Sequence, residues 1–568
     1  MATKTGHFAI IEQFLADGIT HMFGNPGTVE QGLLDALSAY PQMKYILTLQ
    51  ESIAVLMADG HARATRRPTL VQLHSTPGVG NGIGALYQAK RGNSPLVVIG
   101  GDAGIKYAAM DAQMAGDLVA MTRPVTKWST VVQDPSSLLR TIRRAIKIAG
   151  TAPMGPVYVC LPQDILDAPS VEPVRPTSMP STRVLPAPEH VKQAAEWLGT
   201  AARPQIIVGD GVAYSEAQPE LARVAEMLGA EVWEADAGET NMSVRHPLYR
   251  GMTGHMFGDH SLPILQKADA TLVVGTYIVP EVFPHLGDVF ASGSKVVHFD
   301  LNAYEIAKNH PVDLGVVADP KLSLAALADA LESGMPAKQK DAGKARLEAA
   351  TKAQAEKRAA EIEADKKDRD AVPMHMARFI EELAPQLPTD AIIFDEALTS
   401  SPPVTRYLGA TRPGQYFLTR GGSLGVGFPG AIGVSVANPG KTVIGFSGDG
   451  GSMYTIQALW TAARHNIPTK FVVCNNGSYH LLQLNIEQFW KEQGIKKHDY
   501  PLSFDLSAPP LKFAELAQAM SVPAVRVEKP WEIGPAIKQM LASPGPFLID
   551  LVLEGSTHPE RIGNTCGQ

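Results

Sequence analysis

The chain has 568 residues, of which 45% are hydrophobic, and its formal net charge at pH 7 is −7. This length predicts two to four domains, and the mild acidity argues against nucleic acid as a partner. The three cysteines lie far apart in the sequence, which indicates a reducing compartment. The amino terminus lacks a signal-peptide pattern and the apolar runs are too short to span a membrane, so we expect a cytoplasmic protein with no membrane partner.

Residues 1–185 are predicted to form a first α/β domain. A helix is expected to begin at Glu51, directly after an apolar segment. Short apolar segments that alternate with helices predict a parallel sheet with helices on both faces. These expected strands are residues 22–23, 45–49, 69–73, 96–99 and 153–162. The proline-rich residues 169–188 are expected to form a linker.

Residues 189–334 are predicted to form a second α/β domain with a Rossmann-like sheet. Its expected strands are residues 205–208, 270–274 and 295–299. The sequence Gly209-Asp210-Gly211 lacks the GxGxxG spacing of a nucleotide loop, so we interpret it as a plain turn. Residues 335–372 are dense in Ala, Lys and Glu, which predicts a charged helical linker exposed to solvent.

Residues 373–568 are predicted to form a third α/β domain with a short tail at the carboxyl terminus. Its expected strands are residues 391–394, 443–446, 471–473 and 547–552, and a helix is expected over residues 456–463. The predicted fold class is therefore α/β, with three consecutive doubly wound parallel-sheet domains.

Polar residues follow two strands of this third domain. Asp449 lies between glycines after the first strand, and Asn475-Asn476 end the next one. The carboxyl ends of parallel strands meet at the same edge of a sheet, so Asp449 and Asn476 are expected to converge. A carboxylate, an amide oxygen and the main-chain carbonyl of Ser478 would suit Mg²⁺ or Ca²⁺. The sequence predicts a metal site that also holds phosphate oxygens.

The GDG…NN pattern resembles the diphosphate-binding motif of thiamine diphosphate enzymes. The resemblance covers nearly the whole chain, and it is greatest to the benzoylformate decarboxylase branch of the 2-keto acid decarboxylases and lyases. The segments that carry it are FGNPGT (23–28), LTLQE (47–51), LHSTPGVGN (73–81), KWS (127–129), GPVYVCLP (155–162) and GDGGSMYTIQALWTAARHNIPT (448–469). It implies pyrimidine-binding, middle and diphosphate-binding domains in that order.

The resemblance also implies which residues hold thiamine diphosphate. Glu51 would bind the aminopyrimidine ring and promote loss of a proton from the reactive carbon. Mg²⁺ would bind Asp449, Asn476 and Ser478. The remaining contacts would come from the Gly422 carbonyl, the Leu424 side chain, and Thr399, Ser400, Gly450, Gly451, Ser452 and Tyr479. For Thr399 and Ser400, capping of a helix is an alternative role.

The candidate substrate-binding residues match the family pattern less closely than the cofactor residues do. Thr28 occupies the position of a family serine, His74 matches a family histidine, and His285 is expected to supply a second histidine from the middle domain. The expected pocket residues are Asn25, Gln113, His480, Leu481 and Leu482. Gln113 and Asn485 are polar where an aryl pocket would be apolar, so a smaller or more polar acyl group is also plausible.

The function implied is non-oxidative decarboxylation of a benzoylformate-like 2-keto acid to an aldehyde through an enamine, with carboligation as a further outcome. The alternatives are a 2-hydroxyacyl-CoA lyase or oxalyl-CoA-type decarboxylase, an acetolactate-synthase-like carboligase, and an inactive binding protein. The resemblance implies a homodimer or homotetramer with Glu51 and the diphosphate motif from different subunits. The tail from His558 to Gln568 is either a lid or a loose terminus.

Overall fold

The computed structural model describes residues 4–555, which contain three six-stranded sheets in which all strand pairs are parallel. The first sheet contains β1 (His21–Gly24), β2 (Lys44–Leu47), β3 (Thr69–His74), β4 (Leu96–Asp102), β5 (Trp128–Val131) and β6 (Val157–Pro162). The second contains β7 (Pro204–Val208), β8 (Glu231–Glu234), β9 (Tyr249–Met252), β10 (Ala270–Val274), β11 (Lys295–Asp300) and β12 (Leu314–Val317). The third contains β13 (Ile392–Glu396), β14 (Tyr416–Leu418), β15 (Val443–Gly448), β16 (Lys470–Asn475), β17 (Ala524–Val527) and β18 (Phe547–Val552). The α/β fold class predicted from the sequence is confirmed.

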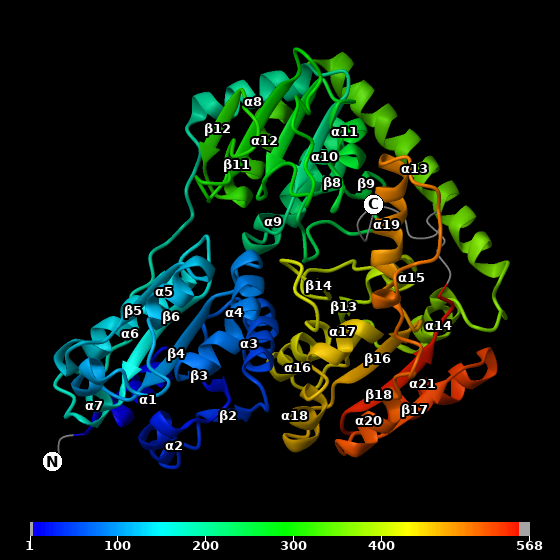
Figure 1. Cartoon of the computed structure of the whole chain (residues 1–568). Helices are drawn as coiled ribbons and strands as arrows, with labels where there is room; N and C mark the ends of the chain where they lie inside the picture. Colours follow the sequence, from blue (N-terminus) through cyan, green and yellow to red (C-terminus); the bar gives the residue numbers. More distant parts are fainter. Residues whose placement is uncertain (1–3, 556–568) are drawn as a thin grey trace.

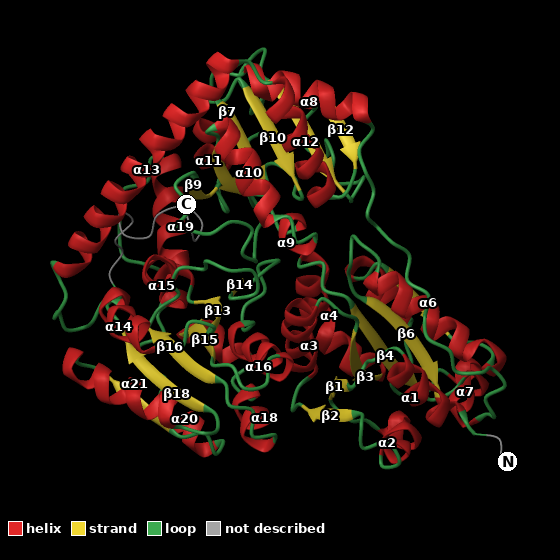
Figure 2. Cartoon of the chain, turned by 180° about the vertical axis from the view of Figure 1, so that it is seen from behind, coloured by secondary structure: helices red, strands yellow, loops and turns green. Residues whose placement is uncertain are grey.

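Helices cover both faces of each sheet, and the three units form the corners of a triangle (Figures 1 and 2). Around the first sheet lie α1 (Gly6–Ala16), α2 (Gln31–Leu37), α3 (Glu51–Thr65), α4 (Ser75–Arg91), α5 (Leu118–Thr122), α6 (Leu138–Gly150) and α7 (Gln163–Asp167). Around the second lie α8 (Pro188–Thr200), α9 (Gly211–Tyr214), α10 (Gln218–Leu228), α11 (Gly258–Leu265) and α12 (Pro320–Gly334). Around the third lie α14 (Met376–Leu383), α15 (Ser401–Leu408), α16 (Gly427–Ala437), α17 (Asp449–Tyr454), α18 (Ala458–Arg464), α19 (His480–Glu492), α20 (Phe513–Ala519) and α21 (Ile533–Ala542).

The strand order is the same in the first and third sheets. It runs β2-β1-β3-β4-β6-β5 in the first and β14-β13-β15-β16-β18-β17 in the third. In both, the chain winds outward in opposite directions from one pair of central strands, β1/β3 and β13/β15. The middle sheet runs β12-β11-β10-β7-β8-β9, which is the order of dinucleotide-binding folds. We therefore expect ligands at the carboxyl ends of the central strands.

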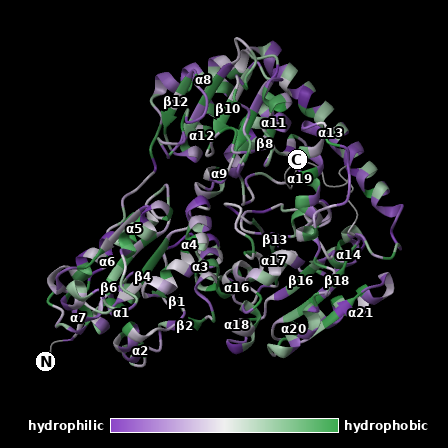
Figure 3. Cartoon of the chain, viewed as in Figure 1, coloured by the Kyte–Doolittle hydropathy of each residue, from purple (hydrophilic) through white to green (hydrophobic). Residues whose placement is uncertain are grey.

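Hydrophobic strands and a hydrophilic connecting helix follow from the composition (Figure 3). β6, β10 and β16 are buried at every residue, as parallel strands covered on both faces should be. The helix α13 (Ala337–Lys366) is polar on most of its surface and buries only Gly343 and Ala350. None of the helices within residues 4–555 combines the length and apolar character that crossing a bilayer requires.

The sequence-based boundaries differ from the structure near the polar motif. The helix expected over residues 456–463 corresponds to α18, and a separate helix before it, α17, starts at Asp449 itself and was not predicted. The three successive small residues after Asp449 give no apolar periodicity, so the sequence pattern does not indicate a helix there. The short strands β5, β8, β9, β12, β14 and β17 were not predicted, because strands of three or four residues give little pattern, and all of these except β8 lie at the edge of a sheet.

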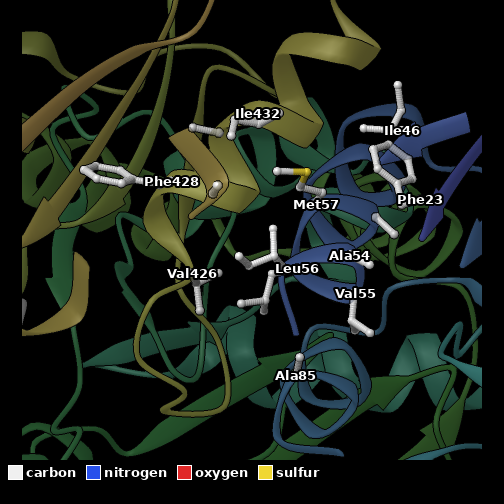
Figure 4. Close-up of a cluster of buried hydrophobic side chains, with 14 of the residues drawn as sticks. Phe23, Ile46, Ala54, Val55, Leu56, Met57, Ala85, Val426, Phe428 and Ile432 are labelled. Carbon is white, nitrogen blue, oxygen red and sulfur yellow. The ribbon is translucent and has the colours of Figure 1, made fainter. Parts of the chain in front are cut away.

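The first and third units share one hydrophobic core, because α3 packs directly against α16. Figure 4 shows Met57 of α3 facing Ile432 of α16, and Leu56 of α3 close to Val426, the residue before α16. Glycine allows this close approach. A Cβ atom at Gly433 would lie only 1.8 Å from the carbonyl oxygen of Met57.

We predict that Gly433→Ala lowers the free energy of unfolding by about 1–3 kcal/mol, because the two helix backbones must move apart. Gly334→Ala at the end of α12 is a matched control, since an added Cβ there meets no atom within 4 Å. Its effect should stay within a few tenths of a kcal/mol. Chemical denaturation followed by circular dichroism measures both, and equal stability of the two variants would contradict the role of the α3–α16 contact.

Candidate active site

The polar residues singled out in the first unit lie around the carboxyl ends of β1, β2 and β3. Asn25 and Thr28 follow β1, Glu51 follows β2, and His74 is the last residue of β3. These strands are neighbours in the sheet, and β1/β3 is the pair at which the winding direction reverses. The topology therefore brings four side chains that are distant in sequence to one edge of the first sheet.

Glu51 is the first residue of α3 and is only 8% exposed. The helix begins there because the Gln50 side chain caps it by accepting a hydrogen bond from the Ile53 N–H at 3.3 Å. The Glu51 carboxylate accepts hydrogen bonds from the Nδ2 atoms of Asn25 at 3.3 Å and Asn81 at 3.0 Å. Two amides, one from the loop after β1 and one from α4, thus fix the orientation of a buried acid.

His74 is paired with a carboxylate that sequence reasoning missed. Its Nδ1 lies 2.8 Å from Oε2 of Glu30, and the other Glu30 oxygen accepts the N–H of Gly101 at 3.0 Å. Burial raises the pKa of Glu30, although His74 and the Gly101 N–H act in the opposite direction. Gly27 leaves room for the imidazole, since a Cβ at that position would lie 2.0 Å from the ring. The arrangement leaves Nε2 of His74 as the ring nitrogen available for chemistry.

Glu30 had one signal in the sequence: an acid that closely follows the NPGT turn. It lies at the end of the short 3₁₀ helix η1 (Thr28–Glu30), which turns its carboxylate inward while Thr28 stays exposed. Asn81 lay inside a motif used for the family resemblance, without a role. Both side chains act through contacts between separate strands and helices, which spacing along the chain does not reveal.

The predicted metal residues are adjacent at the edge of the third sheet. Oδ2 of Asp449 accepts the N–H groups of Asn476 at 3.1 Å and Gly477 at 2.7 Å, and its Oδ1 accepts the Gly450 N–H at 2.7 Å. The Asn476 side-chain oxygen accepts the N–H of Ser478 at 3.0 Å. Burial raises the pKa of Asp449 to about 6.

The chemistry of this donor set fits a hard divalent cation. All the available atoms are oxygens, and among the described residues there is no group of three His, Cys, Asp or Glu side chains that could hold a metal. A site with a single carboxylate depends on other oxygens to complete the coordination shell, and Mg²⁺ commonly obtains them from water and phosphate. The residues present therefore fit a magnesium-bound diphosphate.

Small residues line the edge beside Asp449. Gly450, Gly451 and Ser452 form the first turn of α17 and are buried. The Tyr479 ring occupies the space that a Cβ at Gly450 would need, with the nearest atom at 2.3 Å. This packing brings backbone N–H groups of a helix N-terminus close to the edge, where an anion is favoured.

Thr399 and Ser400 follow β13, the other central strand of the third sheet. They lie in the 3₁₀ helix η6 (Leu398–Ser400), and Ser400 occupies the cap position of α15 without a capping hydrogen bond from its side chain. The alternative role as a helix cap therefore finds no support at Ser400. Both residues line a cavity of about 580 Å³ that is shared by the middle unit, α13 and the third unit.

Gly422 and Leu424 belong to the loop that joins β14 to α16. Gly422 is exposed with φ +72°, and Leu424 is half-buried. The buried Glu396 holds the end of this loop, accepting the N–H groups of Gly425 at 2.6 Å and Gly427 at 2.7 Å. Burial raises the pKa of Glu396 to about 7. This anchor was not predicted from the sequence.

The predicted substrate residues are more scattered. His480, Leu481 and Leu482 begin α19 next to Tyr479, and His480 also lines the cavity. Gln113 is exposed in the loop after β4. His285 lies in the middle unit, where its Nδ1 is 3.7 Å from Oδ1 of Asp259. The structure of one chain does not bring Gln113 or His285 into contact with Glu51 or Asp449, and the tail from residue 558 lies outside the described residues.

Family models of the three domains of thiamine pyrophosphate enzymes match the chain, in the same order as in that family. They are the N-terminal TPP binding domain over residues 4–121, the central domain over 191–327 and the C-terminal TPP binding domain over 399–551. Benzoylformate decarboxylase of Pseudomonas aeruginosa is 30% identical over 563 residues, which cover 96% of this chain and 98% of that protein. Chloroplastic acetolactate synthase 1 of Oryza sativa subsp. japonica is also 30% identical, over 98% of this chain and 85% of the relative.

Comparison with solved structures also indicates a thiamine diphosphate-dependent enzyme. A thiamine diphosphate-dependent 4-hydroxybenzoylformate decarboxylase of Rhodococcus jostii superposes with a TM-score of 0.83 at 27% identity, covering 97% of this chain and 99% of that one. The agreement extends over all three units and their order. The chain therefore belongs to the thiamine diphosphate-dependent enzymes, in the family that includes decarboxylases and acetolactate synthases.

Proposed function

We propose that this enzyme decarboxylates a 2-keto acid to an aldehyde, with thiamine diphosphate and Mg²⁺ as cofactors. The observation that carries the proposal is the pair of polar edges, each at the point where the winding of its sheet reverses, in a chain 30% identical to a benzoylformate decarboxylase over 96% of its length. One edge offers a buried acid and a histidine–carboxylate pair, and the other offers oxygen ligands for a cation.

The third unit would hold the diphosphate end of the cofactor. Asp449, Asn476 and the Ser478 carbonyl would bind Mg²⁺, while Thr399, Ser400 and the first turn of α17 would contact phosphate oxygens. Gly422, Leu424 and Tyr479 would contact the rings of the cofactor. When bound, thiamine diphosphate supplies a nucleophilic carbon and an electron sink for cleavage of the carbon–carbon bond.

The first unit would supply the residues that transfer protons. The Glu51 carboxylate, oriented by Asn25 and Asn81, would exchange a proton with the aminopyrimidine ring. Nε2 of His74, set by the Glu30 contact at Nδ1, would hold or deliver a proton at the reacting carbonyl. The exposed Thr28 hydroxyl would bind the substrate carboxylate, and His285 would approach from the middle unit.

The two edges belong to different units, and the family resemblance implies that they meet across a subunit interface. We propose that Glu51 of one copy faces Asp449 of a second copy in a homodimer or homotetramer. Substrate selection would rest on His480, Leu481, Leu482 and Gln113. Two of these side chains are polar, which favours a polar or smaller acyl group over a plain phenyl ring.

Carboligation is the second candidate function, because acetolactate synthase 1 of rice matches the chain at the same 30% identity as the decarboxylase. The same residues would serve both reactions up to loss of CO₂. The outcomes then differ in whether His74 delivers a proton or a second carbonyl compound occupies the pocket.

The holoenzyme should be incubated separately with benzoylformate, pyruvate, oxalyl-CoA and a 2-hydroxyacyl-CoA, and the products identified by mass spectrometry. We expect an aldehyde and CO₂ from at least one 2-keto acid, with a ligated hydroxyketone as a minor product. Glu51→Ala should abolish turnover, because the proton acceptor is removed. Turnover of the acyl-CoA substrates alone, or full activity of Glu51→Ala, would refute the proposal.

Glu30→Gln should lower kcat at least about tenfold, because an amide no longer fixes the tautomer and orientation of His74 as a carboxylate does. Asp167→Asn is the matched control. It alters another carboxylate–imidazole pair, in which Oδ1 of Asp167 lies 3.0 Å from Nε2 of His7 and which has no proposed role in the reaction. Steady-state kinetics on the best substrate distinguishes them, and wild-type kcat in Glu30→Gln would remove the role of the pair.

Asp449→Asn should raise the Mg²⁺ concentration needed for half-maximal activity by about 10- to 100-fold, since it removes the single charged ligand. The measurement is an Mg²⁺ titration of enzyme stripped with EDTA, at saturating thiamine diphosphate. Asp505→Asn, beside Ser478 but without a proposed ligand role, should titrate like the wild type. Identical Mg²⁺ dependence of Asp449→Asn and the wild type would show that the cation binds elsewhere.

A further inference from the structure

The loop over residues 419–426 carries two of the proposed cofactor contacts, yet its sequence gives it little rigidity. Gly421, Gly422 and Gly425 all have positive φ, at +64°, +72° and +82°. Glycine has more backbone freedom than any other residue, so such a loop loses much entropy when it is ordered. Contacts from outside the loop must fix its shape.

Arg420 provides such a contact at the start of the loop. Its side chain is nearly buried, with the residue 6% exposed, and it extends into the middle unit. Nη1 lies 3.0 Å from Oδ2 of Asp210, and Nη2 lies 3.3 Å from Oδ2 of Asp236. The same guanidinium donates to the main-chain carbonyls of Asp236 and Arg91.

The partner Asp210 is itself held firmly within the middle unit. Its carboxylate accepts the N–H groups of Gly238 at 2.9 Å and Glu239 at 3.0 Å, and a hydrogen bond from Nδ2 of Asn241 at 3.2 Å. Asp210 lies in the Gly-Asp-Gly turn after β7, far along the chain from both proposed cofactor edges. A carboxylate that is fixed within one unit thus pairs with the arginine that begins a glycine-rich loop of another.

Other contacts secure the rest of the loop. The Ser423 hydroxyl donates to the Gly84 carbonyl of α4 at 3.1 Å, and the Thr455 hydroxyl donates to the Gly425 carbonyl at 2.6 Å. Glu396 binds two N–H groups at the end of the loop. Arg420 is the member of this set that connects the loop to the middle unit by charge.

We propose that Arg420 is a positioning residue: its ion pairs with Asp210 and Asp236 let the middle unit hold the loop that presents Gly422 and Leu424 to thiamine diphosphate. This inference rests on the cofactor contacts assigned under the proposed function. It gives Asp210, which does not touch the proposed cofactor site, a measurable effect on cofactor affinity.

The test uses Arg420→Lys, Asp210→Asn and the double variant as full-length proteins. Lysine keeps the charge but loses the planar fork, and asparagine keeps the shape but loses the charge. The dissociation constant of thiamine diphosphate is measured by quenching of tryptophan fluorescence at saturating Mg²⁺. We expect about tenfold weaker binding in each single variant, and no further loss in the double variant, because both changes break one interaction.

Arg378→Lys is the matched control, since it alters another nearly buried guanidinium of the third unit, paired with Glu382 in α14 away from the loop. Its thiamine diphosphate affinity should equal that of the wild type. Thermal unfolding of each apoprotein shows whether a loss of affinity merely follows a loss of stability. If Arg420→Lys fails to fold, Asp210→Asn carries the test alone.

Leu424→Ala tests the proposed contact between Leu424 and thiamine diphosphate separately from the role of Arg420. This variant should itself bind thiamine diphosphate more weakly. Wild-type affinity in Arg420→Lys and Asp210→Asn would overturn the positioning role. Additive losses in the double variant, or an equal loss in Arg378→Lys, would also overturn it. Weaker binding in Arg420→Lys with unchanged binding in Leu424→Ala would show that the effect does not pass through the loop, and would refute the inference as well.

Discussion

Parallel pairing of the strands in the first and third sheets is the constraint on which the site depends. Each strand ends at the same edge as its neighbours, so residues that are far apart in sequence collect there without any long-range motif. Asp449 and Asn476 become adjacent because β15 and β16 pair in register, with Gly448 opposite Cys474. The same argument places His74 of β3 beside the loop that follows β1. Because the two sheets have the same strand order, the two polar edges occupy corresponding positions in the first and third sheets.

Buried carboxylates are a feature that both edges share. Glu30, Glu396 and Asp449 are buried acids whose pKa values are raised by burial, although each accepts hydrogen bonds from backbone N–H groups. Taking a carboxylate out of water is unfavourable unless such bonds replace its hydration. A protein selected for stability alone would fill these positions with apolar side chains. Their presence at the strand ends, and the glycines that make room around them, is best explained by the chemistry of the site.

Elements with a strong residue pattern could be predicted from the sequence alone. The buried central strands, the start of α3 at Glu51 and the pairing of Asp449 with Asn476 all followed from apolar runs and glycine-flanked acids. The resemblance to thiamine diphosphate enzymes is confirmed by the three matched domains. Glu30, Asn81 and Arg420 could not be assigned in the same way, because their partners come from other strands, helices or units. The domain boundaries and the roles of the individual site residues remain predictions.

The turn at Gly209-Asp210-Gly211 shows how a familiar position can acquire a different role. It follows β7, one of the two central strands of the middle sheet, where a dinucleotide-binding fold would hold its ligand. Here a Cβ at Gly211 would lie 2.4 Å from the Cα atom of Gly275, so the two backbones are already in contact at this point. The Asp210 carboxylate is likewise occupied by Gly238, Glu239 and Arg420. Because the space between the strand ends is filled by the protein itself, the turn is better suited to anchor a neighbouring loop than to bind a phosphate. This agrees with its interpretation as a plain turn, and it gives the middle unit a structural reason to influence a cofactor that the other two units would hold.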